Sequence, residues 1–581
     1  MNLSEPFRLV SVFATVLPAV LLAGVASAQV GGHESLSAKG SVRFAPGVKI
    51  PIAPPDLRVF KLSPQKPPSD FVREILPYVA PESKELEPLS ESSFFKENHL
   101  EPKKRMLGAF QGKHVAVLLD PASGDIEAFP PLSLLKPVAI GSRREVERAA
   151  ETRITEILKR NKVIGEDATR FALGNPTSVY GATMEHRQGA SAVSKLYMVY
   201  VPLRRFVKSY PVYGLGSRTF VAFDAEGNVR GFMRRWKLAS AGGKLAATAR
   251  VDEVRRSIVA QLQPLAGNSE VVVRGVKLGY YDGNEDYLQP VYRFTARIHH
   301  LGNQPPAARR GADGLVIGYT PVGKLLEPLP VLGKRPGPSP ALPKVRPPSG
   351  VRKPGDPTVG RYVVRNDDDD WVDDANEFMD GLNSIPVFDD SQYFWAEPFE
   401  FIGDQSDFIN KVELALNEVH GNWWGFSTTG NSGDWVDMTT IPAPGYGSAA
   451  GGSLAYWVIH SCEVLPSPDD TPNWADPWWN IFGGLHSVVS YRTIMWIDDD
   501  VGGPYGHSIA WLAPVVSGWL NEVAGADAYD DGDTDKTHNG RDEPMGRAST
   551  ISACGTEDES VYWSGLHIPA ATCLSIYWFA D

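Results

Sequence analysis

Basic residues are scarce in the C-terminal part of this chain, and tryptophan is scarce in the N-terminal part. Residues 361–581 contain seven Lys/Arg and 37 Asp/Glu, a net charge of −30, whereas the whole chain of 581 residues carries −12. The first 360 residues therefore carry +18, and Trp236 is their only tryptophan out of 15. This step predicts at least two separately built regions. An acidic C-terminal region argues against nucleic acid as a partner, because phosphate binding needs clustered Lys/Arg.

Long hydrophobic runs are also rare, and the one that stands out lies at the N-terminus. It extends from Val10 to Val25 and ends in Ala26-Ser27-Ala28, the small-x-small pattern that precedes signal-peptidase cleavage. The alternative, a membrane anchor, needs about 20 apolar residues, more than this run offers. We therefore expect residues 1–28 to be a signal peptide and the protein to be secreted, periplasmic or extracellular, with no membrane span.

Only three cysteines occur, and all three lie late in the chain. Cys554 and Cys573 are close enough in sequence for a possible disulfide, worth about 3 kcal/mol in the chain-entropy model. That pairing leaves Cys462 over, as an odd count in an oxidising compartment must. A lone thiol in an exported protein is expected to be either buried or part of a functional site.

The order of sequence patterns predicts four regions after residue 28. Residues 29–140 form a Pro-rich N-terminal pro-region with weak patterning. Residues 141–325 are predicted to be α+β and to contain the same motif twice, a helix followed by antiparallel strands. The helices begin near Ser142 and Val251, and the strands include 195–201, 218–224, 270–278 and 289–298.

The stretch YPVYGLGSRTFVAFDAEGNVRGF in this region resembles the PepSY and thermolysin-propeptide type of inhibitory module. That resemblance implies two propeptide-like units that precede a secreted protease. An ordinary α+β binding domain is the alternative.

A linker is predicted over residues 326–365, before the C-terminal domain at 366–581. Its part from 331 to 360 contains eight prolines and six Lys/Arg, which cannot form a core. An exposed, basic segment of this kind is also accessible to a processing protease.

Two segments of the C-terminal domain carry the candidate chemistry. FINKVELALNEVHGNWWGFS contains His420-Gly421 after an apolar element, and GGSLAYWVIHSCEVLPS contains Cys462 after an apolar strand. Reacting groups collect at the carboxyl ends of strands in α/β sheets. A thiol there becomes a nucleophile with the help of a base, and backbone N–H groups stabilise the oxyanion.

This pattern, His-Gly after one strand and Cys after the next, is similar to the caspase-like (clan CD) cysteine peptidases, such as gingipain, legumain and clostripain. The resemblance implies an α/β fold with a mostly parallel sheet flanked by helices. It also implies that Cys462 is the nucleophile, His420 the base, and the N–H groups of Gly421 and Cys462 the oxyanion donors. Glu463 departs from the family, which often has Gly shortly after the Cys, and a carboxylate beside a thiol raises its pKa.

Each candidate has a structural alternative. Cys462 could be a buried thiol at a strand end, and His420 a turn histidine bonded to backbone. His460 projects from the same face as Cys462, and a Cys/His pair has too few ligands for zinc, so a structural role is expected.

An acidic loop, DAYDDGDTDKTHNGRDEP, places Asp531, Asp533 and Asp535 at alternate positions, as in a calcium loop. Lys536 occupies the position where an EF-hand needs Gly, so the pattern fails as an EF-hand. A solvated acidic insertion is therefore expected, with an irregular calcium site as the alternative. No other cofactor is predicted to be required.

Two functions follow from these patterns. The first is a secreted cysteine endopeptidase made as a zymogen, which cleaves protein or peptide substrates after basic residues. Its basic N-terminal half would be an intramolecular inhibitor, docked on the acidic domain through a field that high salt weakens. The second is a catalytically inactive extracellular binding protein that uses an aromatic surface, formed by Trp423, Trp424, Trp478 and Trp479.

Overall fold

A computed structural model of the chain describes residues 40–580, apart from the following positions: 99, 101, 162, 166, 187–191, 246–247, 267–268, 300–313, 333–338, 343–356, 366–369, 429–434, 498–499, 527–532 and 564. The predicted signal peptide and much of the predicted linker lie outside the described residues. No described helix is long and apolar enough to cross a membrane.

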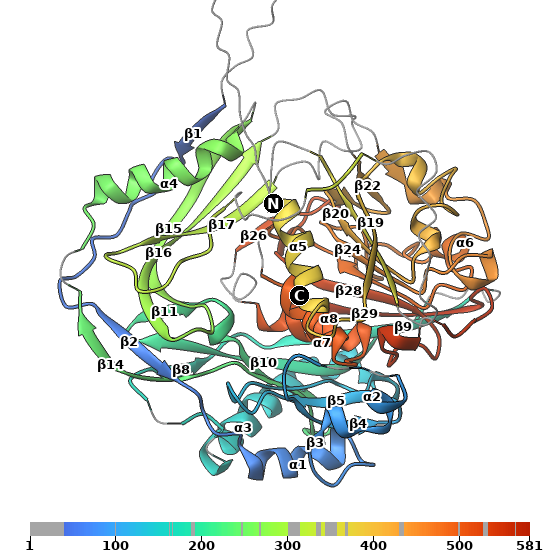
Figure 1. Cartoon of the computed structure of the whole chain (residues 1–581), viewed down its shortest axis with the longest axis horizontal. Helices are drawn as coiled ribbons and strands as arrows, with labels where there is room; N and C mark the ends of the chain where they lie inside the picture. The colour runs from blue at the N-terminus through green and yellow to red at the C-terminus, as the bar shows by residue number, and fades with distance from the viewer. Residues whose placement is uncertain are drawn as a thin grey trace, which may run out of the picture. The chain divides into compact units, whose positions relative to one another are not determined.

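The C-terminal region is built on five parallel strands, in the order β19-β18-β20-β24-β25. Strands β19, β20 and β24 are labelled in Figure 1. Their bounds are β18 Thr358–Val363, β19 Asp389–Trp395, β20 Leu414–Glu418, β24 Tyr456–His460 and β25 Ser487–Tyr491. All strands but the edge strand β19 are buried along their whole length, as expected for a parallel sheet covered on both faces. The predicted α/β class is confirmed at this level.

Helices α5 (Asp370–Leu382), α7 (Gly502–Ala510) and α8 (Val515–Gly525) pack together over this sheet. Glycines permit the close approach of α5 and α7. A Cβ atom at Gly381 would lie 2.2 Å from the carbonyl oxygen of Gly503, and one at Gly506 would lie 2.3 Å from that of Phe378. A fourth helix, α6 (Trp478–Ile481), is a single turn.

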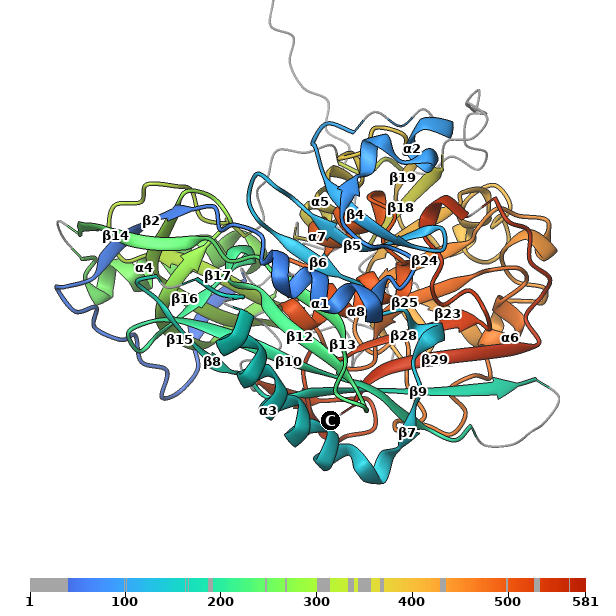
Figure 2. The same cartoon turned by 90° about the horizontal axis from the view of Figure 1, so that it is seen from below.

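The sheet continues, antiparallel, from the C-terminal region into the N-terminal half. After β25 come β28 (Ala548–Ala553) and β29 (Cys573–Ala580), and β29 pairs with β9 (Thr177–Glu185) over eight residue pairs. Figure 2 shows β9 and β29 side by side. The two halves of opposite charge therefore share one hydrogen-bonded sheet, so they are not held together by surface charge alone.

Beyond β9 the sheet extends through β10, β12, β13, β6, β5, β4 and β3. These strands have the bounds β10 Lys195–Val207, β12 Thr219–Asp224, β13 Val229–Arg234, β6 Ile126–Ala128, β5 His114–Leu119, β4 Leu107–Gln111 and β3 Glu87–Pro88. Short strands β7 (Val138–Ala139) and β8 (Arg170–Leu173) also pair with β10.

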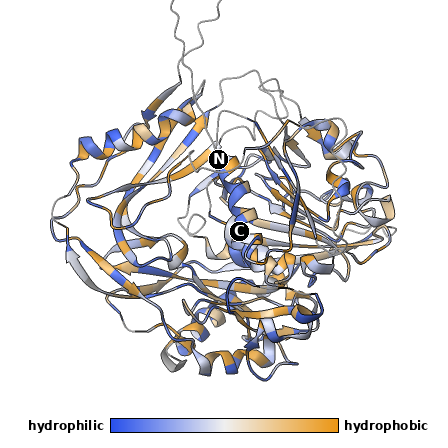
Figure 3. Ribbon diagram, viewed as in Figure 1, coloured by the Kyte–Doolittle hydropathy of each residue, from blue (hydrophilic) through white to orange (hydrophobic). Residues whose placement is uncertain are grey.

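The repeated helix-then-strands motif is present. Helix α3 (Arg143–Asn161) buries Ile154 and Ile157 and packs on β10, and α4 (Val251–Ala266) precedes β15 (Glu270–Asp282), β16 (Tyr287–His299) and β17 (Gly314–Pro321). Figure 3 shows hydrophobic and hydrophilic residues alternating along α4. The period of 3.6 for helices and 2 for strands explains why the sequence revealed this motif.

Strands β15–β17 form a second part of the sheet together with β1 (Ser41–Phe44), β2 (Arg58–Ser63), β11 (Tyr210–Tyr213) and β14 (Leu238–Lys244). The pairing of β11 with β10 joins this part to the strands described above. We refer to α4 with β15–β17 as the second α+β unit.

Two predicted regions contain more structure than expected. Within 29–140, helices α1 (Ser69–Val79) and α2 (Ser93–Glu97) accompany β1–β6, and α1 buries Phe71 and Ile75 completely. The predicted linker ends earlier than residue 365, because 358–363 forms the buried strand β18. A short apolar strand after a Pro-rich run gives little periodic signal, so composition alone misplaced this boundary.

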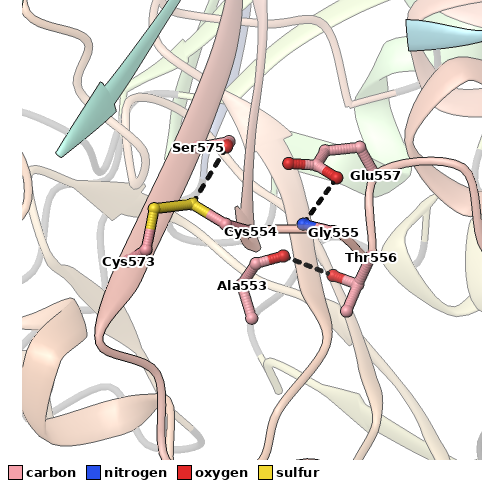
Figure 4. Close-up of a disulfide and its surroundings, with 7 residues drawn as sticks. All are labelled: Ala553, Cys554, Gly555, Thr556, Glu557, Cys573 and Ser575. Carbon is pink, nitrogen blue, oxygen red and sulfur yellow. Dashed lines mark hydrogen bonds between the residues drawn. A yellow bond between two sulfur atoms is a disulfide. The ribbon is translucent and has the colours of Figure 1, made fainter. Parts of the chain in front are cut away.

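The predicted disulfide is present. Cys554 and Cys573 join the end of β28 to the start of β29, with their Cα atoms 5.5 Å apart (Figure 4). The turn after Cys554 is fixed by Gly555 N–H, which donates to Glu557 Oε2 at 2.8 Å. Cys462 is left as a free, buried cysteine, as the odd count predicts.

Candidate functional site

His420 and Cys462 follow the ends of neighbouring parallel strands. Glu418, the last residue of β20, pairs in register with His460, the last residue of β24, and each candidate lies two residues further on. The backbone N–H of Val419 donates to the carbonyl oxygen of His460 at 3.3 Å, which holds the two strand ends together. The sheet thus brings the two predicted residues to one edge.

Gly421 is pressed against the segment that carries the thiol. A Cβ atom at this position would lie 2.3 Å from Ser461 Oγ, 2.4 Å from Val464 Cγ2 and 3.0 Å from the carbonyl oxygen of Cys462. A side chain at 421 would collide with the side chains of Ser461 and Val464 and press on the backbone of Cys462, so the position favours glycine. The His-Gly pair of the sequence therefore has a steric reason, and it places the backbone of 421 beside that of 461–462.

His420 is itself buried, with 5% of its surface exposed. Its ring lies edge-on to Trp371 of α5, with centroids 5.0 Å apart. The short strands β21 (Gly421–Asn422), β22 (Gly425–Ser427) and β23 (Trp435–Asp437) follow it, and Ser427 N–H donates to the carbonyl oxygen of His420 at 2.8 Å. This hairpin fixes the backbone from which the imidazole projects.

The Cys462 thiol is enclosed in the structure. Only 4% of the residue is exposed, and Sγ accepts a hydrogen bond from Met495 N–H at 3.4 Å. Burial raises the pKa of Cys462 to about 12, and the neighbouring Glu463 carboxylate contributes in the same direction. In this state the group is a thiol and not a thiolate.

Glu463 adopts the left-handed conformation, with φ of 56°, which is strained for a residue other than Gly. Its side chain is buried, and Oε1 accepts a hydrogen bond from the N–H of His538 at 2.5 Å. Burial raises the pKa of this carboxyl to about 8. Glu463 therefore ties the residue after the thiol to the loop between β26 (Thr534–Lys536) and β27 (Asp542–Pro544).

Residues of the second α+β unit reach this neighbourhood. Arg297 of β16 forms an ion pair with Asp535 of β26, and Arg274 of β15 lies 3.6 Å from the same carboxylate. The charge of Arg297 also lowers the pKa of Cys462, so it acts on the thiol as well. On β17, the carbonyl oxygen of Leu315 accepts a hydrogen bond from Ile497 N–H at 2.8 Å, two residues beyond the methionine that contacts Cys462.

Carboxylates border the same region. The side chains of Asp470 and Glu543 are buried and share Arg492, which lies 2.7 Å from Asp470 and 3.1 Å from Glu543. Both carboxylates raise the pKa of Glu463. Three carboxyl groups therefore surround one arginine near the candidate nucleophile.

His460 has a structural partner, as expected. Its Nδ1 lies 2.6 Å from Glu418 Oε2, and both residues are buried. Asp374 of α5 joins them, so that one potential ligand atom from each of the three residues lies within 4.8 Å of the others. The sequence did not reveal Asp374 or Glu418, because their proximity depends on strand register and on the docking of α5.

Among the described residues, the predicted calcium ligands do not form a cluster. Asp531 lies outside the described residues, and Asp535 is paired with arginines from β15 and β16.

Of the four tryptophans in the predicted aromatic face, Trp478 is in the core and the other three are partly buried. Trp478 is 0% exposed, and Trp479 stacks on His186 with centroids 4.6 Å apart. Trp423 and Trp424 are partly buried, and Trp423 packs on His538. The four side chains therefore do not form one exposed platform.

Comparison with known proteins adds a family of unknown function. The model of a domain of unknown function (DUF6345) matches residues 388–565, the region that contains both candidate residues. No curated protein matches the chain. Among solved structures, an uncharacterized protein from Eubacterium rectale ATCC 33656 is similar at 7% identity over 41% of this chain and 82% of that one, with a TM-score of 0.22. A likeness of that size carries no argument about fold or function.

Proposed function

We propose that this protein is a secreted cysteine endopeptidase of the caspase-like type, made as an inactive precursor, with Cys462 as nucleophile and His420 as base. The observation that carries the proposal is the placement of both residues, two positions beyond paired residues of neighbouring parallel strands. Strand ends of this kind are where reacting groups collect in α/β sheets. The close contact of Gly421 with 461–462 supports the expected role of its N–H as an oxyanion donor.

In the proposed reaction, His420 accepts the proton of the Cys462 thiol as sulfur attacks the carbonyl carbon of the substrate. The N–H groups of Gly421 and Cys462 stabilise the resulting oxyanion, and His420 returns the proton to the departing amine. Water then hydrolyses the thioester and regenerates the thiol.

The state described by the structure supports the precursor part of the proposal. A thiol with a pKa of about 12 and 4% exposure cannot attack a substrate. The segment around Met495, which covers it, is bonded in turn to β17, and the Asp535 hairpin is paired with Arg274 and Arg297. The second α+β unit is therefore the proposed inhibitory element.

Activation cannot consist of dissociation of the whole N-terminal half. The pairing of β29 with β9 would have to break, and so would the ion pair of Arg218 with Glu522, whose side chains are 2% and 0% exposed. Salt screens buried pairs weakly. We therefore propose a local release of the second α+β unit after cleavage in the linker.

Basic residues are the proposed cleavage sites in the substrate. Asp470 and Glu543 pair with Arg492 near Cys462, Glu543 also lies 4.0 Å from Arg541, and Arg297 already supplies a guanidinium to this acidic neighbourhood. A substrate Lys or Arg would meet complementary charge there.

An inactive extracellular binding protein is the second candidate. The observation in its favour is that Cys462 is buried beside Glu463, a residue that disfavours a thiolate. The disulfide suits either function, because such bonds persist in oxidising compartments such as the periplasm or the extracellular space.

The test compares the full chain with Cys462→Ala and His420→Ala after limited cleavage of the linker by trypsin. Hydrolysis of peptides with Arg or Lys before the scissile bond is expected for the parent chain and is expected to be absent in both variants. Equal hydrolysis in all three chains, or none in any of them once trypsin is inhibited, would refute the peptidase proposal. Circular dichroism of the variants controls for folding.

A further inference from the structure

A cavity of about 710 Å³ lies on the side of α5 and α7, and Cys462 and His420 are not among the residues that line it. Most of its walls come from β5 with the turn into β6, the turn between β15 and β16, residues 328–330, α5 and α7. Lys104, Met106, Leu215, Arg235 and Asp500 complete the lining. Cavities of about 300–1,000 Å³ are typical of small-molecule sites. The second α+β unit and the C-terminal region both contribute to it.

The cavity is strongly acidic. Seven carboxylate residues line it, and the cationic residues are Lys104 and Arg235. The seven are Asp120, Asp125, Glu127, Glu285, Glu377, Asp380 and Asp500.

The charge of Arg235 is already balanced. Its Nη1 donates to Glu522 Oε2 at 2.9 Å, and its Nη2 lies 3.5 Å from Glu127 Oε2. Apart from this group, the lining contains six carboxylate residues and Lys104, so acidic side chains predominate in it.

The base of the cavity is rigid, because Glu127 belongs to a buried network. Glu127 is 5% exposed, accepts from Asn521 Nδ2 at 3.2 Å, and lies 3.1 Å from Ser508 Oγ. Ser508 Oγ is also 3.2 Å from Glu522 Oε1, and one hydroxyl proton cannot serve both carboxylates. Burial and the charge of Glu522 raise the pKa of Glu127 to about 8, so a proton resides here at neutral pH.

Apolar side chains line the cavity between the carboxylates. They are Met106, Leu118, Ile126, Leu215, Tyr281 and Leu329. Apolar walls contribute nothing to the binding of a bare metal ion, since hard cations require converging oxygen ligands. An aromatic ring or alkyl chain that carries a positive charge fits both kinds of surface.

We propose that this cavity binds an organic cation, with a primary amine or guanidinium on an apolar body. The ammonium contacts the carboxylates of α5 and of the β5–β6 turn, and the apolar part packs against Tyr281 and Leu329. This inference does not depend on the proposed peptidase activity, because no residue of the candidate catalytic site takes part.

The test is isothermal titration calorimetry of the full chain with tyramine, an aromatic primary amine. The matched ligand is 4-hydroxyphenylacetate, which keeps the ring and reverses the charge. Asp380→Lys reverses an exposed charge on α5 and is expected to weaken tyramine binding by about tenfold or more, while Asp120→Asn weakens it by about threefold. Asp252→Asn, at an exposed position of α4 outside the cavity, is the control and should bind as the parent does.

The proposal predicts saturable binding of tyramine by the parent chain and none of 4-hydroxyphenylacetate. Equal affinity of the parent and Asp380→Lys, equal binding of the two ligands, or no heat with tyramine would overturn it. Displacement of tyramine by micromolar calcium chloride would also overturn it, since a metal ion would then be the preferred occupant. A thermal unfolding curve for each variant shows that lost binding is not lost folding.

Discussion

The enclosure of Cys462 leads to a quantitative prediction about its reactivity. Alkylation by iodoacetamide requires the thiolate, and the intact chain holds the pKa of this thiol at about 12, against an ordinary value of 9.0. At any pH well below 9, such a shift lowers the thiolate population by about 1,000-fold. Limited access through a surface that is 4% exposed lowers the rate further.

The assay is mass spectrometry of the full chain after timed exposure to iodoacetamide at pH 7.5, with and without urea. The other two cysteines form a disulfide, so one adduct per chain reports on Cys462 alone. We expect labelling in the folded chain to be at least about 1,000-fold slower than in the unfolded chain. Cys462→Ala provides the blank.

Similar rates in the folded and unfolded chains would refute the reasoning, because they would show an exposed, ordinary thiol. Fast labelling of the folded chain at mildly acidic pH would refute it more strongly. That result would reveal an activated thiolate in a chain for which we infer an inactive state.

Three further predictions concern stability and the contacts around the thiol. Burial raises the pKa of Glu400 from 4.5 to about 8, so the folded chain keeps a proton that the unfolded chain loses. The free energy of unfolding should therefore fall by up to about 5 kcal/mol as pH rises from about 4.5 to 8. Denaturant titrations of Glu400→Gln should lack that part of the decline. Replacing Cys554 and Cys573 together by Ser should lower the free energy of unfolding by about 3 kcal/mol. An unchanged urea midpoint would show that the disulfide does not stabilise the fold. Asp535→Asn weakens the ion pair with Arg297 and should speed iodoacetamide labelling of the folded chain by about tenfold, and no change would show that this pair does not help to cover the thiol.

Much of the fold followed from local patterns in the sequence. The helices at 143–161 and 251–266 carry apolar residues at 3–4-residue spacing, the strands after them are rich in apolar residues, and both motifs are present. The disulfide followed from the short separation of Cys554 and Cys573 in the sequence, and the odd count predicted a free Cys462. The strand 358–363 was missed because a six-residue apolar run beside a Pro-rich segment has no distinctive period.

The pairing of β29 with β9 could not be predicted, because nothing local specifies a partner almost 400 residues away. This pairing changed the meaning of the charge step at residue 360. The sequence predicted that the two halves dock through charges that salt can screen. In the structure they share a sheet and buried ion pairs, such as that of Arg218 with Glu522.

The candidate site was predictable only in part, because local patterns place the two residues but not their surroundings. His420 and Cys462 each follow an apolar strand, which the sequence shows directly. The covering of the thiol by Met495, and the approach of Arg297, depend on tertiary packing and were not foreseen.

The most direct test of the central claim is covalent capture of the nucleophile. The linker-cut chain would be treated with a peptidyl acyloxymethyl ketone that presents Arg to the site, and the adduct located by mass spectrometry. We predict one adduct on Cys462 in the parent chain, and none in His420→Ala or in the uncut chain. A parent chain that stays unmodified after the cut, or a His420→Ala chain that is modified as fast as the parent, would contradict the assignment of this pair as a latent peptidase site.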